Sequence, residues 1–194
     1  MKYVLGLTGQ TGAGKSTLSG IAEKAGFFVI NCDEVAHSVI EKDEVKTALT
    51  AVFTSDILNA DGTVSRPQLA ARAFANKEST QLLNETVLPF IVREIACLTE
   101  KTQKDKILLD APTLYESGAD KMCNSVVAVI ADSSVRKKRI IERDNLTSEA
   151  ADKRINAGQK EEFYLSRADK AIKNNGNLEE FQKEFESIIN NIRR

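Results

Sequence analysis

Residues 9–16 read GQTGAGKS, a complete G-x-x-x-x-G-K-[ST] pattern. The apolar run at 3–7 before it is typical of a short buried strand, and the apolar residues of 17–25 after it have helical spacing. A strand, a glycine-rich turn and a helix are the context that gives this pattern its physical meaning. The stretch therefore predicts a phosphate-binding loop and, with it, binding of a nucleoside triphosphate.

Each position of the loop has an expected role. Glycines allow the backbone N–H groups to point inward, and the start of the helix adds partial positive charge. Lys15 can then reach the β- and γ-phosphates, while the Ser16 hydroxyl can bind Mg²⁺. The candidate nucleotide-binding residues of this loop are Gly9, Gly12, Ala13, Gly14, Lys15, Ser16 and Thr17.

Composition narrows the remaining possibilities. The 194 residues fit one domain, or one domain with an inserted lobe. The net charge of −1 argues against a nucleic-acid binder held by bulk charge. Three cysteines without C-x-x-C spacing and a single histidine exclude a standard zinc site and fit a reducing compartment. No apolar run reaches membrane-spanning length and the first strand leaves no room for a signal peptide, so we expect a cytoplasmic protein without membrane or nucleic-acid partners.

Short apolar runs separated by helical segments predict an α/β fold of the P-loop NTPase and kinase class. We expect a five-stranded parallel sheet flanked by helices, because such runs are apolar on both faces. The last segment, 178–192, has the spacing of an amphipathic helix that packs on the sheet. The expected strands are 3–7, 27–30, 107–109, 126–130 and 168–172.

Two segments interrupt the sheet. Residues 34–103 look helical, broken by the turn 59–62 and by Pro67 and Pro89, and we interpret them as an inserted helical lobe over the carboxyl ends of the strands. Residues 133–167 contain two or three charged helices with few apolar positions, which favours a solvated, mobile lid. The core is then formed by 1–33, 104–132 and 168–194.

Two aspartates follow expected strands, where ligands of open α/β sheets bind. Asp110 has the form of a carboxylate that binds Mg²⁺, although an aspartate here can also cap a helix. Asp33 could orient a substrate hydroxyl and accept its proton. Its alternative is to act as the N-cap of a helix from Glu34 to about Ile40.

The densest basic cluster lies in the expected lid. Arg136, Arg139 and Arg143 share one face of a helix. Guanidinium groups on one face can close over phosphates and stabilise the charge that develops during transfer. The alternative is a solvated helix face.

The chain resembles the dephospho-coenzyme A kinase family almost from end to end. The phosphate loop alone is shared by many kinases, but the ordered set of the other elements makes the match specific. The residues that carry the resemblance are GLTGQTGAGKST at 6–17, Asp33, Asp61-Gly62 with Arg66, Leu83-Asn84 with Pro89, Asp110 and Pro112 with Glu116, and Arg139, Arg143 and Arg154 before Asn174-Asn175-Gly176.

The resemblance implies transfer of the ATP γ-phosphoryl group to the ribose 3′-hydroxyl of dephospho-coenzyme A, with Mg²⁺. It makes 34–103 the coenzyme-binding lobe. We expect a monomer or weak homo-oligomer. The implied catalytic residues are Lys15, Asp33, Arg139 and Arg143. The implied acceptor-binding residues are Thr8, Asp33, Arg66 and Asp110; Ser16 and Asp110 serve the metal, and Asn175 and Gly176 lie near the adenine.

Several positions depart from the family pattern, mainly on the acceptor side and at the end of the lid. They are Asn31, His37, Leu88, Thr113 and Gly158. Two alternatives stay open: a nucleoside or nucleoside monophosphate kinase, and a regulatory module that binds nucleotide and a protein partner. A GTPase switch is disfavoured because the Asn-Lys-x-Asp that reads guanine fails at Ser79.

Overall fold

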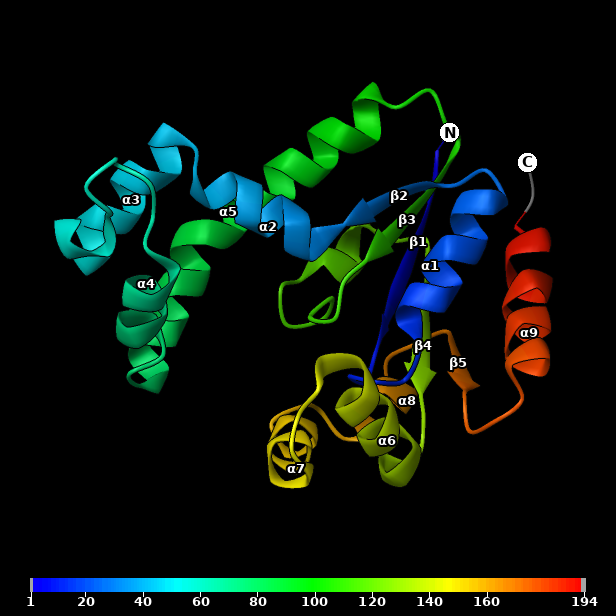
Figure 1. Ribbon diagram of the computed structural model, residues 1–194. Coiled ribbons are helices and arrows are strands. Elements are labelled where there is room, and N and C mark those ends of the chain that lie inside the picture. Colours follow the sequence, from blue (N-terminus) through cyan, green and yellow to red (C-terminus); the bar gives the residue numbers. More distant parts are fainter. Residues whose placement is uncertain (1, 193–194) are drawn as a thin grey trace. The chain divides into compact units, whose positions relative to one another are not determined.

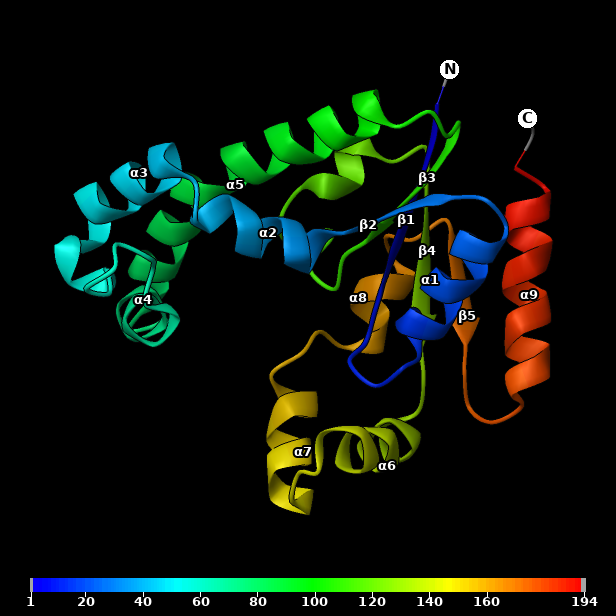
Figure 2. The same cartoon turned by 45° about the horizontal axis from the view of Figure 1, so that its top comes forward.

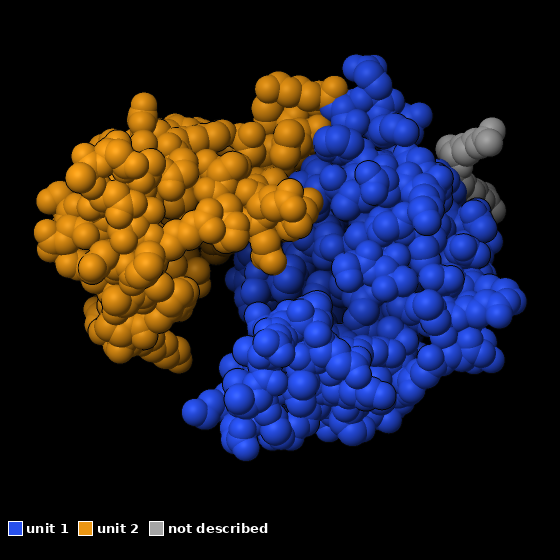
Figure 3. Space-filling view, in the orientation of Figure 1, with its two compact units in different colours: residues 1–30, 102–194 blue, residues 31–101 orange. Residues whose placement is uncertain are grey.

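The computed structural model describes residues 2–192. Within them the chain divides into two compact units, one formed by 2–30 and 102–192 and the other by 31–101, which Figure 3 colours separately. None of the helices within residues 2–192 combines the length and the apolar character needed to cross a membrane.

The first unit is built on a five-stranded parallel sheet, as the sequence predicts, in the order β2-β3-β1-β4-β5 (Figure 1). The last strand begins two residues later than predicted, at Lys170. The strands are β1 (Tyr3–Gly9), β2 (Phe28–Asn31), β3 (Lys106–Asp110), β4 (Ser125–Ile130) and β5 (Lys170–Lys173).

Register fixes which strand ends meet. Leu7 of β1 pairs with Asp110 of β3, and Gly9 of β1 pairs with Val129 of β4. The phosphate loop therefore leaves the sheet beside the carboxyl ends of β3 and β4, as the crevice rule for open α/β sheets requires.

Helices cover both faces of the sheet. The helices α1 (Lys15–Lys24) and α9 (Leu178–Asn190) lie side by side on one face, as both Figure 1 and Figure 2 show. Between them and the strands lies a core that includes the fully buried Leu5, Leu18 and Phe185. On the other face, Tyr164 of α8 (Glu161–Leu165) packs on Ala128 and Ile130 of β4. A short 3₁₀ turn, η2 (Ala119–Met122), precedes β4.

Residues 133–167 form three helices within this unit, in agreement with the charged helical segment expected there. They are α6 (Ser133–Asp144), α7 (Ser148–Asn156) and α8. Lys137 of α6 and Asp152 of α7 form an ion pair at 2.6 Å, which connects these two helices.

The second unit is helical. Its helices are α2 (Cys32–Ile40), α3 (Asp43–Phe53), η1 (Ser55–Ile57), α4 (Arg66–Ala73) and α5 (Lys77–Lys101). The predicted turn at 59–62 is confirmed and is closed by an isolated bridge between Leu58 and Val64. Pro67 stands in the first turn of α4, where a missing N–H costs nothing.

Pro89 was expected to break a helix, and this prediction is wrong. Helix α5 runs through Pro89 from Lys77 to Lys101. A proline inside a helix costs about 3 kcal/mol. The packing of α5 against α2, α3 and α4, with Val87 and Ile95 buried, outweighs that local cost.

Candidate active site

Glycines give the phosphate loop its shape. Gly9 has φ 139° and Gly14, the N-cap of α1, has φ 111°, a region that side chains rarely adopt. A Cβ atom on Gly9 would lie 2.1 Å from the backbone oxygen of Val129, and one on Gly14 would lie 2.5 Å from Nδ2 of Asn174. The loop therefore passes so close to its neighbours that only glycine fits. Since α1 begins at Lys15, the side chains of Lys15, Ser16 and Thr17 all belong to its first turn.

The end of β5 holds the loop from one side. Asn174 is 5% exposed, and its Nδ2 donates to the carbonyl oxygen of Ala13 at 2.7 Å. Arg139 of α6 donates to the backbone and side-chain oxygens of Asn174 at 3.0 and 3.1 Å and to Ala13 O at 3.4 Å. Sequence reasoning did not select Asn174 from the Asn-Asn-Gly motif, although it is the residue that bonds the loop.

Asn175 and Gly176, expected near the adenine, lie just beyond. The Nδ2 of Asn175 donates to the Asp132 carboxylate at 2.8 Å, and Lys173 forms an ion pair with the same carboxylate at 3.0 Å. The hydrogen bond from Lys173, and then that from Asn175, lowers the pKa of Asp132. Asn175 thus connects the end of β5 to the start of α6.

On the other side of the loop, Asp110 ends β3. Its Oδ2 accepts a hydrogen bond of 2.6 Å from the hydroxyl of Ser19, one turn into α1 from Lys15. The helix-cap alternative for Asp110 is wrong, because turns follow this strand and the next helical segment begins at Ala119. Ser19 could have been noticed, because its i+4 spacing from Lys15 places it on the same helix face. The buried hydroxyl of Thr8 donates to Pro112 O at 3.2 Å.

Asp33 stands two residues after the end of β2. The capping alternative for it is wrong, because Asn31 is the N-cap of α2 and its Oδ1 accepts from the backbone N–H groups of Asp33 and Glu34. The Asp33 side chain is exposed in the first turn of α2. The departure from the family pattern at Asn31 therefore has a structural role, and the Asp33 carboxylate has no capping role.

The arginines of α6 have three different environments. Arg136 is 7% exposed, Arg139 bonds the loop as described, and Arg143 is exposed and bonds Asp144 at 2.7 and 2.8 Å. The hydrogen bond from Arg143 lowers the pKa of Asp144, which also pairs with Arg154. The three arginines therefore do not form one solvated face.

In the helical unit, Arg66 borders a cavity of about 320 Å³. The wall is mostly apolar, and His37, Arg66 and Asn84 add the polar groups. Leu88, one of the departures from the family pattern, belongs to the same wall.

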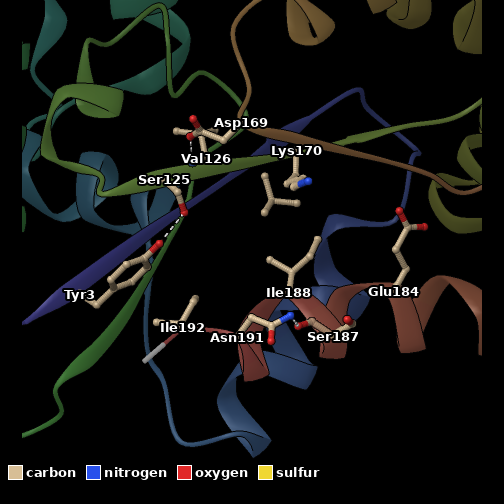
Figure 4. Close-up of a pocket in the computed structure, with 11 residues that line it drawn as sticks. Tyr3, Ser125, Val126, Asp169, Lys170, Glu184, Ser187, Ile188, Asn191 and Ile192 are labelled. Carbon is tan, nitrogen blue, oxygen red and sulfur yellow. Dashed lines mark hydrogen bonds between the residues drawn. The ribbon is translucent and has the colours of Figure 1, made fainter. Parts of the chain in front are cut away.

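A further cavity, of about 820 Å³, lies where β1, β4 and β5 begin, beside α9 (Figure 4). Its polar groups are largely bonded to protein: Tyr3 Oη and Ser125 Oγ are 2.8 Å apart, and the Asp169 carboxylate accepts from Val126 N at 2.7 Å. None of the candidate site residues borders it.

These features together define a P-loop nucleotide-binding protein. They are a glycine loop between β1 and α1, a lysine and a serine in the first helical turn, and a carboxylate at the end of the neighbouring strand. Together with Arg139, which reaches the loop from the helical segment after β4, this site is that of a P-loop kinase.

Comparisons with known proteins identify the kinase family. The sequence model of the dephospho-CoA kinase family matches residues 3–180. The dephospho-CoA kinase of Fusobacterium nucleatum is 36% identical over 189 residues, which are 97% of this chain and 98% of the relative. The chain belongs to the dephospho-CoA kinase family, an ATP-dependent family, and its activity is that of a dephospho-CoA kinase.

Solved structures agree. The dephospho-CoA kinase of Campylobacter jejuni has a TM-score of 0.71 at 29% identity and covers 99% of this chain and 98% of its own. The protein TT1252 of Thermus thermophilus has a TM-score of 0.85 at 25% identity, with 100% and 99% coverage. The family assignment decides against the two alternatives that the sequence left open.

Proposed function

We propose that this chain carries out the dephospho-CoA kinase reaction by transferring the ATP γ-phosphoryl group to the ribose 3′-hydroxyl of the acceptor, with residues of the phosphate loop, the strand ends and the lid in defined roles. The intact loop inside the family match is the observation that carries the proposal. The acceptor oxygen forms a bond to the γ-phosphorus while the bond from that phosphorus to the β–γ bridging oxygen breaks. ADP leaves, and coenzyme A is the second product.

The loop neutralises and positions the triphosphate. The backbone N–H groups of residues 9–17, the start of α1 and the Lys15 ammonium supply positive charge. Arg139 is positioned to add charge from α6, since it already bonds the loop at Ala13. Arg143 has the same proposed role, although its guanidinium bonds Asp144 in this structure.

The side chains around the loop fit Mg²⁺. Ser16 is exposed in the first turn of α1, and Oδ2 of Asp110 already has one hydrogen-bond donor, Ser19. A Mg²⁺ ion beside a nucleotide is typically held by phosphate oxygens and one or two protein oxygens, which Ser16 and Asp110 would supply. Ser16 and Asp110 would hold the ion there, and it would supply positive charge to offset the charge that develops on the phosphoryl group during transfer.

Asp33 is the proposed group that orients the acceptor hydroxyl and takes its proton. It follows β2, whose carboxyl end lies at the same edge of the sheet as those of β1 and β3 because the strands are parallel. Its carboxylate is free of a capping role, and transfer through a loose transition state asks for little basicity.

The helical lobe is the proposed binding site for the rest of the coenzyme, with Thr8 and Asp110 on the side of the sheet. Support comes from the cavity beside Arg66, because an apolar wall with a cation at its rim suits an uncharged arm attached to a pyrophosphate. None of the three cysteines forms a disulfide within residues 2–192, which supports action in the cytosol. We propose a monomer or weak homo-oligomer.

The test measures ADP release with dephospho-CoA and with its 3′-deoxy analogue. The proposal expects turnover with the first and none with the second. Asp33→Ala should lower turnover by at least ~10²-fold, the scale of a positioned acid–base group, while ATP affinity stays within a few-fold. Asp43→Ala, which removes another exposed carboxylate in the first turn of the next helix, is the matched control and should stay within twofold. Phosphorylation of the 3′-deoxy analogue would show that the ribose 3′-hydroxyl is not the acceptor, and would contradict the proposal.

A further inference from the structure

Arg136 is a buried cation that forms no ion pair with a carboxylate of residues 2–192. Its side chain reaches the end of β4, where Nε donates to the carbonyl oxygen of Ala131 at 2.9 Å. Burial lowers its pKa, although Glu161 lies near enough to raise that pKa in part. A buried charge is costly unless an opposite charge accompanies it. The guanidinium is therefore suited to an anion that the protein itself does not supply.

The neighbouring arginines already have acceptors. Arg139 donates to Ala13 and Asn174, and Arg143 and Arg154 both pair with Asp144. The terminal nitrogens of Arg136 make no hydrogen bond to any residue that the structure describes. Among these four guanidinium groups, Arg136 is thus the one whose two terminal nitrogens both lack a hydrogen-bond partner among the described residues.

The position of Arg136 connects it to the phosphate loop. A Cβ atom on Gly12 would lie 3.0 Å from the carbonyl oxygen of Arg136, so α6 packs directly on the loop. Arg136 also borders a cavity of about 290 Å³ whose wall includes Gly9, Gln10 and Pro112. This cavity lies beside the first half of the loop, next to the end of β3.

Gln10, which lines the same cavity, carries a second donor. It is 5% exposed, and its Oε1 accepts from Ala131 N at 3.3 Å, which identifies Nε2 as the donor end. That Nε2 makes no hydrogen bond to any described residue. Both Gln10 and Arg136 are therefore anchored on Ala131 and keep donors for another acceptor.

The rest of the wall leaves room and carries net positive charge. Gly158, where the family pattern has a glutamine, contributes no side chain, and a Cβ there would have Ile155 O at 3.5 Å as its near neighbour. The charged side chains of the wall are Arg136, Arg154 and the exposed Glu116. A small oxyanion fits this combination of donors, charge and space.

We propose that Arg136 and Gln10 form an anion subsite beside the phosphate loop that binds a phosphate group of one of the two reactants. This inference rests on the proposed function for the identity of the reactants. The phosphate belongs either to ATP or to the pyrophosphate of dephospho-CoA, and the shared chemistry is a phosphate oxyanion held by a buried guanidinium and an amide N–H.

The test compares Arg136→Gln with Arg136→Lys and with Lys138→Gln, which removes an exposed charge from the same helix. Dissociation constants of ATP and of dephospho-CoA are measured separately by titration calorimetry, so neither depends on turnover. Arg136→Gln should weaken one of the two ligands by about 10- to 100-fold, the range for loss of a charged hydrogen bond. Arg136→Lys should recover part of that loss, and Lys138→Gln should stay within twofold for both ligands.

The ligand that loses affinity identifies the source of the phosphate. The melting temperature of ligand-free Arg136→Gln should equal or exceed that of the wild type, because an unpaired buried charge has been removed. Affinities within twofold of wild type would overturn the subsite. So would a loss of affinity accompanied by a lower melting temperature, because Arg136 would then support the fold instead of the ligand. A wild-type protein without turnover on dephospho-CoA would contradict the proposed function and leave both titrations interpretable.

Discussion

Asn174→Ala tests how firmly the phosphate loop is held. The amide side chain makes two hydrogen bonds, donating to Ala13 O at 2.7 Å and accepting from Arg139 Nη2 at 3.1 Å. Alanine removes both bonds. The carbonyl oxygen of Ala13 then keeps one side-chain donor, Arg139 Nη1, at the longer distance of 3.4 Å. Asn174 and Ala13 are both buried, so water is poorly placed to replace the lost amide.

The magnitude follows from these two bonds. A neutral hydrogen bond contributes about 1 kcal/mol and one with a charged donor about 1.5–3 kcal/mol. Their loss should lower the free energy of unfolding of the first unit by about 2–4 kcal/mol. ATP should bind about 10-fold more weakly, because a loop that is no longer held in place must be ordered on binding.

Tyrosine fluorescence is a selective probe for this measurement. The chain has no tryptophan, and its three tyrosines all lie in the unit that contains the sheet. Urea unfolding followed by this signal therefore reports on that unit, and ATP affinity is measured by calorimetry. Asn191→Ala is the control, because it removes an exposed amide whose hydrogen bond stays within α9 and its C-cap. If the two variants differ by less than about 0.5 kcal/mol, the loop does not depend on Asn174 and the reasoning fails.

Three further changes are expected to behave as follows. Gly9→Ala should lower the free energy of unfolding by more than about 4 kcal/mol, because the new Cβ would lie 2.1 Å from a backbone carbonyl oxygen of β4. Gly26 also has positive φ, but a Cβ there would lie in open space, so Gly26→Ala should lower it by only about 1–2 kcal/mol. Urea unfolding measures both changes. Tyr115→Phe should leave stability unchanged or raise it by up to about 1 kcal/mol, since no described residue bonds its buried hydroxyl. Burial raises the pKa of Tyr115 to about 12. The stabilisation that comes from the neutral phenol is therefore complete below pH 10 and is lost as the pH rises towards 12. A spectrophotometric titration of Tyr115→Phe should lack one tyrosine ionisation near pH 12 that the wild type shows. The lowered pKa of Asp132 means that its pairing stabilises the fold at neutral pH and is lost as the pH falls through that pKa, and Lys173→Met should raise the midpoint in a carboxyl NMR titration.

The sheet was predictable because its signal is local. Each strand is a short apolar run, and a strand covered on both faces needs little more than that. Pro89 was misjudged because the interactions that keep α5 continuous come from α2, α3 and α4, which are separate in sequence. Local propensity indicated a break, and tertiary packing decided otherwise.

The site divides in the same way. The loop from Gly9 to Ser16 was readable because its chemistry requires residue types at fixed spacing. Asn174 and Ser19 were not selected, since their importance depends on bonds to Ala13 and Asp110, 161 and 91 positions away. Asn31 and Asp33 show a further difficulty, because both residue types cap helices well and only the backbone geometry tells which one does so.

The structure changes the interpretation of the predicted lid, residues 133–167, more than that of any other segment. A charged composition suggested a solvated flap over residues 133–167, yet α6 packs on Gly12 with Ile140 and bonds Ala13 through Arg139. Moving α6 away from the loop would break these contacts and expose the buried Arg136. Asn145, with φ 51°, ends α6 and begins the short connection to α7. The ion pairs Lys137–Asp152 and Arg154–Asp144 between α6 and α7 are partly exposed. We therefore infer that α6 belongs to the scaffold of the phosphate loop, and that any closure over the reactants has to come from residues beyond Asn145.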